Sequence, residues 1–201
     1  RLFAESLGVS VEFMEINWDM KAMELDNKGI DVVWNGMTIT DEVKGLMSVS
    51  EPYCLNAQVV VVPTDKAAQY QNLESLKGLR FAAENGSAGA AQLDKLGISY
   101  TATDTQGKAL LEVASGTSDA CVIDLLMAGA MIGEGTDYAN LTYTVNLNTA
   151  NGEQSEEYGV GFRQGSDLVD AFNTFWKNAY DAGTVMETAA TYGVQESIVQ
   201  K

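Results

Sequence analysis

The sequence contains no histidine, and only 12 basic residues stand against 28 acidic ones. Without histidine, the chain cannot build a Ser-His-Asp or Cys-His catalytic relay or a histidine-ligated metal site. The formal net charge of −16 argues against nucleic acid and anionic lipid as partners, because both are bound by basic surfaces. No apolar run approaches the roughly 20 residues of a membrane-spanning helix.

Cysteine is scarce as well. Cys54 and Cys121 are the only two, which is too few for a disulfide framework or a cysteine zinc site. We expect two buried, unpaired thiols, with a single bridge as the alternative, and no cofactor. The rest of the composition, 46% hydrophobic and 20% charged among 201 residues, is typical of a globular chain that forms one large domain or two small lobes.

Hydrophobic periodicity switches repeatedly between the period of a strand and that of a helix. Alternating or wholly apolar segments predict strands at 9–16, 30–34, 59–62, 80–83, 119–123, 141–147 and 158–163. Amphipathic segments predict helices at 20–25, from 41, at 73–76, 90–96, 105–113, 125–132 and 168–182, and after 184. Residues 149–157, with Glu156 and Glu157, are expected to form a solvated loop. This alternation predicts an α/β fold with mostly parallel sheets.

Several short phrases occur in a fixed order along the chain. They are Lys28–Asp31, Asn35–Glu42, Ser50–Tyr53, Leu76–Gly78, Gly86–Ala88, Ser118–Ala120 with Asp124, Tyr158–Arg163, Ala182–Thr184 and Tyr192–Gly193. Together they resemble the amino-acid-type solute-binding proteins of ABC importers, which have the type II periplasmic-binding-protein fold. The resemblance extends from residue 7 to residue 195.

The resemblance implies two α/β lobes joined by two crossing segments, with the ligand in the cleft between them. Lobe one would comprise residues 1–62 and 148–201, and lobe two residues 63–147. The crossings would be Val59–Val62 and Leu141–Leu147, and the loop at 149–157 would lie near the hinge. The family's first strand and most of its first helix would precede Arg1. Without that βα unit, lobe one would exchange strands or borrow one from a partner chain.

The ligand site can be carried over position by position from the resemblance. In the family, an arginine in the pattern Thr-x-x-Arg binds the ligand's α-carboxylate, and the residues just before it line the site. A small-residue turn adds backbone N–H groups, and an acid in the second lobe pairs with the α-amino group. The implied ligand-binding residues are Asn35, Gly36, Met37, Thr38, Val43, Glu84, Gly86, Ser87, Ala88 and Asp124.

The sequence departs from the family's pattern at Val43, which stands where the family has the arginine. Valine has no donor, so a carboxylate buried there would lose its main partner, and Lys44 cannot copy the arginine fork. Ala88 lacks the hydroxyl that is common in that turn, and Val49 replaces an aromatic residue. Either the ligand lacks an α-carboxylate, or the pocket has been altered, or the protein binds poorly. An acidic cleft with aromatic residues (Trp34, Tyr53, Glu84, Asp124) would suit an amine or another cation.

Each of these residues also has a purely structural interpretation. Asn35 and Gly36 could form a turn, and Thr38 could cap the helix that starts at 41. Ser87 and Asp124 could be N-caps of the helices that follow them.

Three functions compete. The first is extracytoplasmic capture of an amino acid or related amine for delivery to an ABC permease, by a protein held in the periplasm or at the cell surface, where a lipid anchor upstream of Arg1 is an option. The second is a natural or engineered sensor or interaction module on the same fold. The third is a dehydratase-like enzyme that uses Glu84 or Asp124 as an acid of raised pKa.

Overall fold

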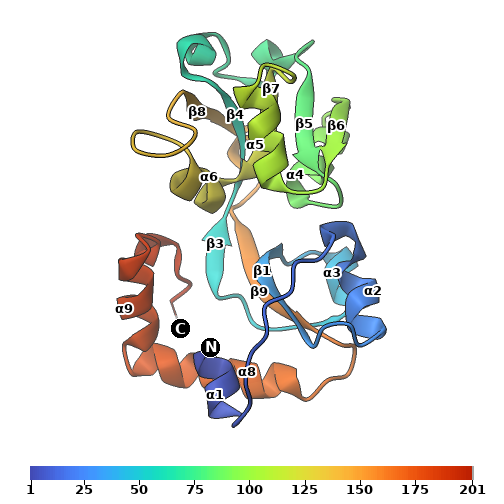
Figure 1. The fold of residues 1–201 in the computed structure, drawn as a ribbon, viewed down its shortest axis with the longest axis vertical. Helices are drawn as coiled ribbons and strands as arrows, with labels where there is room; N and C mark the ends of the chain where they lie inside the picture. The colour runs from blue at the N-terminus through green and yellow to red at the C-terminus, as the bar shows by residue number, and fades with distance from the viewer. Residues whose placement is uncertain (201) are drawn as a thin grey trace. The chain divides into compact units, whose positions relative to one another are not determined.

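The computed structural model describes residues 1–200, and the chain divides into two compact units (Figure 1). The first unit contains Arg1–Ile16, Met20–Leu55 and the residues from Glu157 on. The second unit contains Asn56–Glu156 together with the short piece Asn17–Asp19. The main chain therefore passes between the units at residues 55/56 and 156/157, and also on either side of the short piece Asn17–Asp19.

The second unit is built on a five-stranded sheet in the order β6-β5-β7-β4-β8. Strands β5, β6 and β7 are parallel, whereas β4 runs antiparallel to both β7 and β8. The strands are β4 (Gln58–Pro63), β5 (Phe81–Glu84), β6 (Tyr100–Thr103), β7 (Ala120–Asp124) and β8 (Leu141–Asn146).

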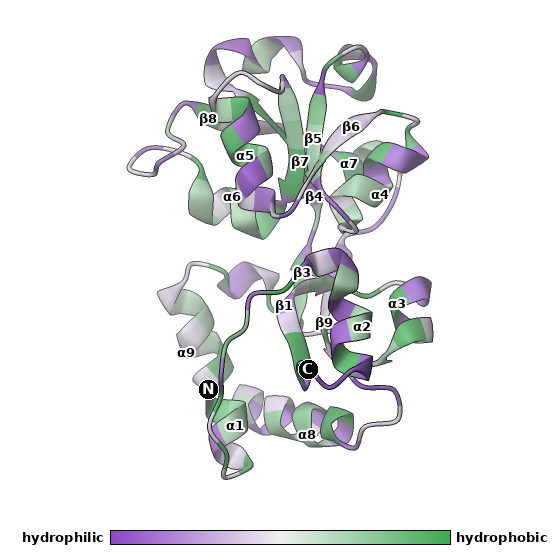
Figure 2. Cartoon of the chain, turned by 45° about the vertical axis from the view of Figure 1, so that its right-hand side comes forward, coloured by the Kyte–Doolittle hydropathy of each residue, from purple (hydrophilic) through white to green (hydrophobic). Residues whose placement is uncertain are grey.

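Alternate residues of this sheet bury themselves in two separate cores. Val60 and Val62 pack with α4 (Ala88–Lys95) on one face, and Val59 and Val61 pack with α5 (Gln106–Ala114) on the other. All four valines are fully buried, which confirms the predicted buried strand. Figure 2 shows the apolar character of β4, β5 and β7. The other helical elements here are η2 (Thr64–Gln69), η3 (Leu73–Leu76), α6 (Leu125–Met131) and α7 (Leu147–Ala150).

The sheet of the first unit is centred on β9 (Glu156–Phe162), which pairs antiparallel with β1 (Val32–Thr38) and β2 (Ser48–Val49) and also pairs with β3 (Cys54–Asn56). The expectation of mostly parallel sheets is therefore wrong for this unit. An aromatic core around Phe172 of α8 (Leu168–Asp181) covers the sheet. The remaining helices and 3-10 turns are α1 (Leu2–Ser6), η1 (Trp18–Met20), α2 (Lys21–Asp26), α3 (Asp41–Leu46), α9 (Thr184–Thr191) and η4 (Gln195–Ser197).

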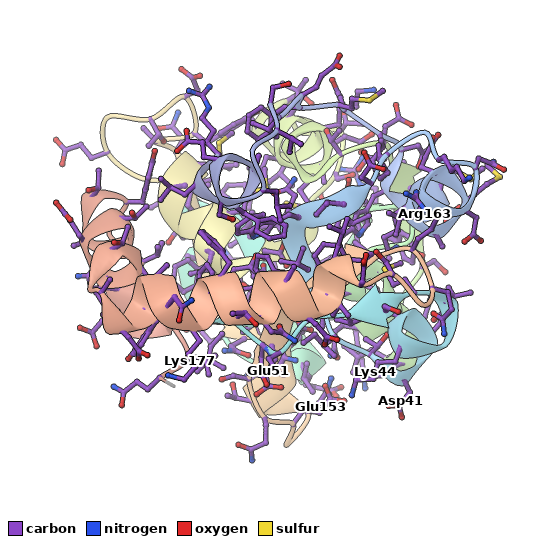
Figure 3. The ribbon with its side chains drawn as sticks, turned by 90° about the horizontal axis from the view of Figure 1, so that it is seen from below. Asp41, Lys44, Glu51, Glu153, Arg163 and Lys177 are labelled. Carbon is purple, nitrogen blue, oxygen red and sulfur yellow. The ribbon has the colours of Figure 1, made fainter. Side chains whose placement is uncertain are left out.

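Arg163, which ends the Tyr158–Arg163 phrase, has a structural role. Its side chain is labelled in Figure 3. The guanidinium donates hydrogen bonds to the carbonyl oxygens of Leu25 (2.8 Å) and Ile30 (3.0 Å) and to the carboxylate of Asp31 (3.0 Å). One side chain thereby fixes the end of α2 and the turn before β1 to the far end of β9.

The two glycines of β9 leave room for side chains beneath the strand. A Cβ on Gly159 would lie 2.8 Å from side-chain atoms of Ile39 and Val49. A Cβ on Gly161 would meet the sulfur of Met47 and lie 3.0 Å from Cε of Met37. Met37 and Met47 are 1% and 2% exposed, so neither can swing into solvent.

We expect Gly161→Ala to lower the free energy of unfolding by about 2 kcal/mol, because an overfilled core must shift its neighbours. Urea unfolding followed by circular dichroism measures this difference. Gly45→Ala is the matched control, since a Cβ on Gly45 of α3 meets nothing within 4 Å. It should be neutral or stabilising by up to about 1 kcal/mol. Equal stability of the two variants would contradict the steric account.

Three expectations about chain organisation differ from the structure. The expected crossings at 59–62 and 141–147 are strands β4 and β8 inside the second unit, because both take part in its sheet. The segment 9–16 is not a strand, although it alternates, because none of its residues pairs with a neighbouring strand in the described part of the chain. Glu156 begins β9 and is half-buried, so it does not belong to a solvated loop.

Both cysteines are free and buried, as expected. Burial raises the pKa of the Cys54 thiol to about 11, and it also raises the pKa of Cys121. Because the thiolate is the reactive form, we expect a thiol reagent at pH 8 to label both cysteines of denatured protein and to react far more slowly with native protein. Rapid labelling of one thiol in the native state would show that Cys54 or Cys121 is accessible.

Candidate functional site

Two of the implied ligand-binding acids lie at one edge of the sheet in the second unit. Strands β5 and β7 are neighbours and parallel, so their carboxyl ends meet at the same edge. Glu84 is the last residue of β5, and Asp124 is the last residue of β7. The turn that contains Gly86 and Ser87 follows β5 directly and leads into α4.

This turn presents the start of a helix. Ser87 is the N-cap of α4, and its Oγ accepts a hydrogen bond from the N–H of Ala90 (3.1 Å). Gly86 has φ +68°, a left-handed conformation that favours glycine, and a Cβ there would lie 2.6 Å from Oδ1 of Asp19. Ser87 thus has the capping role that the sequence allowed. The backbone N–H groups of the first turn are the part of this element that can bind an anion.

Asp124 is held by three side-chain amides rather than by a helix cap. Its Oδ1 accepts hydrogen bonds from Asn56 Nδ2 (2.8 Å) and Gln58 Nε2 (2.7 Å), and its Oδ2 accepts one from Gln106 Nε2 (2.7 Å). Asp124 occupies the N-cap position of α6, as the sequence allowed, but its side chain makes no capping hydrogen bond there. Amide donors stabilise an ionised carboxylate, and this one is 9% exposed.

A second carboxylate shares these amides. Glu156 Oε2 accepts hydrogen bonds from Gln58 Nε2 (2.8 Å) and Asn56 Nδ2 (3.3 Å), and its Oε1 accepts one from Asn148 Nδ2 (3.3 Å). Sequence reasoning missed this network. Its one visible signal was a set of amide residues, Asn56 and Gln58, at the start of the apolar run 59–62, where a buried strand should begin with apolar side chains.

The implied residues of the first unit surround an irregularity in β1. The pairing of β1 with β9 shifts register between Val33 and Met37. Gly36 lies in that interval with φ +60°, and Asn35 is exposed. Asn35 and Gly36 therefore belong to an irregular part of β1 rather than to a free-standing turn. Met37 points into the core beneath Gly161.

Thr38 does not cap α3. Thr40 is the N-cap, and its Oγ1 accepts a hydrogen bond from the N–H of Val43 (3.1 Å). Thr38 remains within β1 opposite Tyr158. Val43 is 9% exposed, so position 43 holds a buried apolar side chain.

The structure thus brings Glu84, Gly86, Ser87, Ala88 and Asp124 to one edge of the second unit's sheet. Asn35, Gly36, Met37, Thr38 and Val43 lie on β1 and α3 of the first unit. Within residues 1–200, no three His, Cys, Asp or Glu side chains are grouped so that they could hold a metal ion. None of the helices described is both long and apolar enough to cross a membrane.

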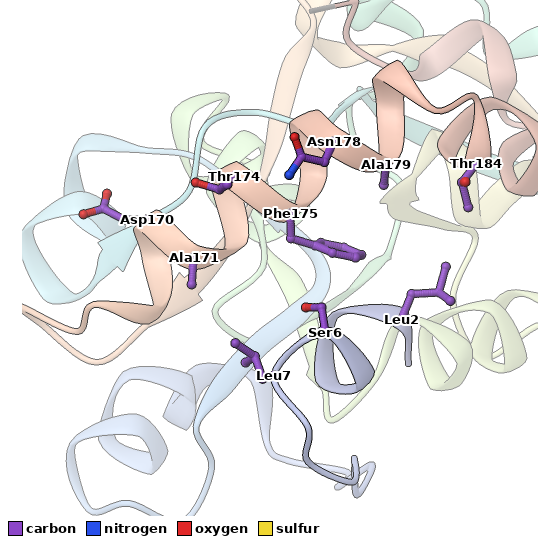
Figure 4. A pocket seen from close by; sticks show the side chains of 10 residues that line it. All are labelled: Leu2, Ser6, Leu7, Asp170, Ala171, Thr174, Phe175, Asn178, Ala179 and Thr184. Atoms are coloured by element: carbon purple, nitrogen blue, oxygen red, sulfur yellow. The ribbon is translucent and has the colours of Figure 1, made fainter.

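A groove on the first unit lies apart from these residues. It has a volume of about 830 Å³ and runs between α1 and α8, with Leu2, Leu7 and Phe175 on its walls (Figure 4). None of the implied ligand-binding residues lines it.

Comparison with known proteins identifies similar chains. The model of the family described as bacterial extracellular solute-binding proteins, family 3, matches residues 1–195. The L-cystine-binding protein TcyJ of Escherichia coli (strain K12) is 28% identical over 173 residues, which cover 85% of this chain and 62% of TcyJ. The chain therefore spans less than two thirds of the length of that curated relative.

Solved structures of amino-acid-binding proteins are also similar to this chain. A mutant of the arginine-bound ArgBP from T. maritima has 30% identity and a TM-score of 0.77, with 88% of this chain and 80% of that chain covered. The ancestral amino acid-binding protein AncCDT-1, a precursor of cyclohexadienyl dehydratase, has 26% identity and a TM-score of 0.82, with 94% and 81% covered. These likenesses confirm the two-lobe α/β type II fold.

Proposed function

Because the chain belongs to the bacterial extracellular solute-binding proteins, family 3, we propose that it captures an amino acid or a related amine outside the cytoplasm and delivers it to the permease of an ABC importer. TcyJ and ArgBP support the choice of ligand class, since the one is named for cystine and the other is bound to arginine. Capture would proceed by closure of the two units on the ligand.

The observation that carries this proposal is the position of Asp124. A buried carboxylate with amide partners at the carboxyl end of β7 lies at the same sheet edge as the first turn of α4. A zwitterionic or cationic ligand needs an acceptor for its ammonium group, and Asp124 supplies one. The backbone N–H groups at Ser87 and Ala88 would donate hydrogen bonds to a carboxylate of the ligand.

The relatives favour binding over turnover, since TcyJ is named as a binding protein and ArgBP is described in an arginine-bound form. We therefore propose that the chain is not an enzyme, although its neighbour AncCDT-1 is a precursor of a dehydratase.

Titration calorimetry with the common amino acids and their decarboxylated amines tests the proposal. We expect one ligand class to bind with a stoichiometry of one and to remain chemically unchanged. Trp34 gives an optical signal, because it is 39% exposed and its ring contacts Phe172 and Tyr53 edge-on. No binding across both panels would refute the proposal, and conversion of a bound ligand would favour the enzyme.

A further inference from the structure

Gln58 is the only glutamine among the largest fully buried side chains of residues 1–200, with 1% exposure. It opens β4, and its Cα lies opposite that of Asp124 in the antiparallel pairing of β4 with β7. Its backbone N–H donates to Oδ1 of Asn148 (2.7 Å), so the residue is fixed at both backbone and side chain. Burying a polar side chain lowers the stability of the fold unless its donors and acceptors are hydrogen-bonded.

The two ends of the Gln58 amide contact both parts of the sheet edge described above. Its Nε2 donates to Asp124 Oδ1 (2.7 Å) and to Glu156 Oε2 (2.8 Å). Its Oε1 lies against the first turn of α4, where a Cβ on Gly89 would be 2.9 Å away. Gln58 therefore bridges two carboxylates on one side and lies against the first turn of α4 on the other.

This bridge has a specific electrostatic consequence. Asp124 and Glu156 carry the same charge and approach one nitrogen atom within hydrogen-bond distance. Like charges at such separation repel strongly in a poorly solvated site. The amide hydrogens of Gln58, like those of Asn56, lie between the two oxygens and reduce this repulsion without adding charge.

We propose that Gln58 is a positioning residue for ligand binding: it orients Asp124 and shields it from Glu156, so that Asp124 can accept the ligand's ammonium group. This inference rests on the proposed function. It adds Gln58, a residue that contacts Asp124 and not the ligand itself. Glu156 is the carboxylate whose charge Gln58 offsets.

Gln58→Leu tests the proposal, because it preserves the size of the side chain and removes the amide. We expect the dissociation constant of the amino acid or amine that wild type binds best to rise about thirtyfold, since two buried acceptors lose a donor. Adding Glu156→Gln should restore affinity to within about threefold of wild type, because the new amide at 156 can donate to Asp124 and the repelling charge is gone. If Gln58 served only to fill space, adding Glu156→Gln would not restore the affinity.

Glu157→Gln is the charge-matched control, since Glu157 is the exposed neighbour of Glu156 on β9. Gln58→Leu with Glu157→Gln should stay as weak as Gln58→Leu. If Gln58→Leu does not fold alone, the double variant with Glu156→Gln decides: folded and binding supports the proposal, and any other result overturns it. Wild-type affinity in Gln58→Leu, or a loss that Glu156→Gln leaves in place, also overturns it. Absence of binding by wild type would refute the proposed function itself.

Discussion

Asp124→Asn is expected to weaken ligand binding about a thousandfold, because it removes the charged partner of a buried ammonium group. The substitution keeps the shape of the side chain. The hydrogen bonds from Asn56 and Gln58 to one oxygen can persist, since asparagine retains that oxygen. The new Nδ2 would face the Nε2 of Gln106, and neither group can accept the other's hydrogen. Some loss of stability is therefore expected beside the larger loss of affinity. Calorimetry at pH 7 with the best ligand of wild type, alongside thermal melts of both proteins, separates the two effects.

Asp119→Asn is the matched control for this prediction. It removes the same charge just before β7, at the opposite end of that strand from Asp124. Asp119 accepts hydrogen bonds from the side chain of Arg80 (2.8 and 3.0 Å), far from the sheet edge that holds Asp124. Ligand affinity should be unchanged. A comparable loss of affinity in both variants would mean that overall charge, and not Asp124, governs binding.

The control has its own signature in acid. Hydrogen bonds from the Arg80 side chain lower the pKa of Asp119 to about 2. A lowered folded-state pKa contributes stability above the unfolded value near 4, and that contribution is lost as the pH falls through about 2. Wild type should therefore lose stability between about pH 4 and pH 2 more steeply than Asp119→Asn. This difference in stability between the two proteins should be small, because the pair of Arg80 and Asp119 is largely exposed to solvent.

The local parts of the fold could be predicted from the sequence. The apolar run at 59–62 and the amphipathic helix from Leu168 are set by periodicity within a few residues, and both are present as β4 and α8. Pairing between strands could not be predicted in the same way. Whether 9–16 forms a strand depends on a neighbour that periodicity does not encode. The strand β9, which Glu156 begins, likewise pairs with the distant β1, β2 and β3.

The candidate site shows the same division. The turn at Gly86 and Ser87 and the acid at Asp124 could be placed, because each follows a strand in a recognisable phrase. The amides that hold Asp124 could not, since Asn56 and Gln58 lie far along the chain from Gln106. The three meet only through the register of β4 with β7 and the packing of α5. Side chains that act through another residue leave no local pattern.

Val43→Arg is expected to raise the affinity for α-amino acids about a hundredfold, because a guanidinium fork can bind the α-carboxylate through two charge-assisted hydrogen bonds. The long side chain can bury its stem where valine lies now and extend its head toward water. Placing it at a position that is 9% exposed should lower the free energy of unfolding by about 2 kcal/mol. Calorimetry with arginine and with agmatine, its decarboxylated amine, measures the effect.

Only a ligand with an α-carboxylate should gain from the new arginine, so affinity for arginine should rise and affinity for agmatine should stay the same. Val43→Lys carries the same charge without the fork and should give a smaller gain, and Val43→Met controls for side-chain length. An equal gain for agmatine would show that the substitution acts through general electrostatics. No gain for any amino acid would mean that position 43 does not face the carboxylate, and the site would then have to bind its ligand through the second unit's edge and Asp124.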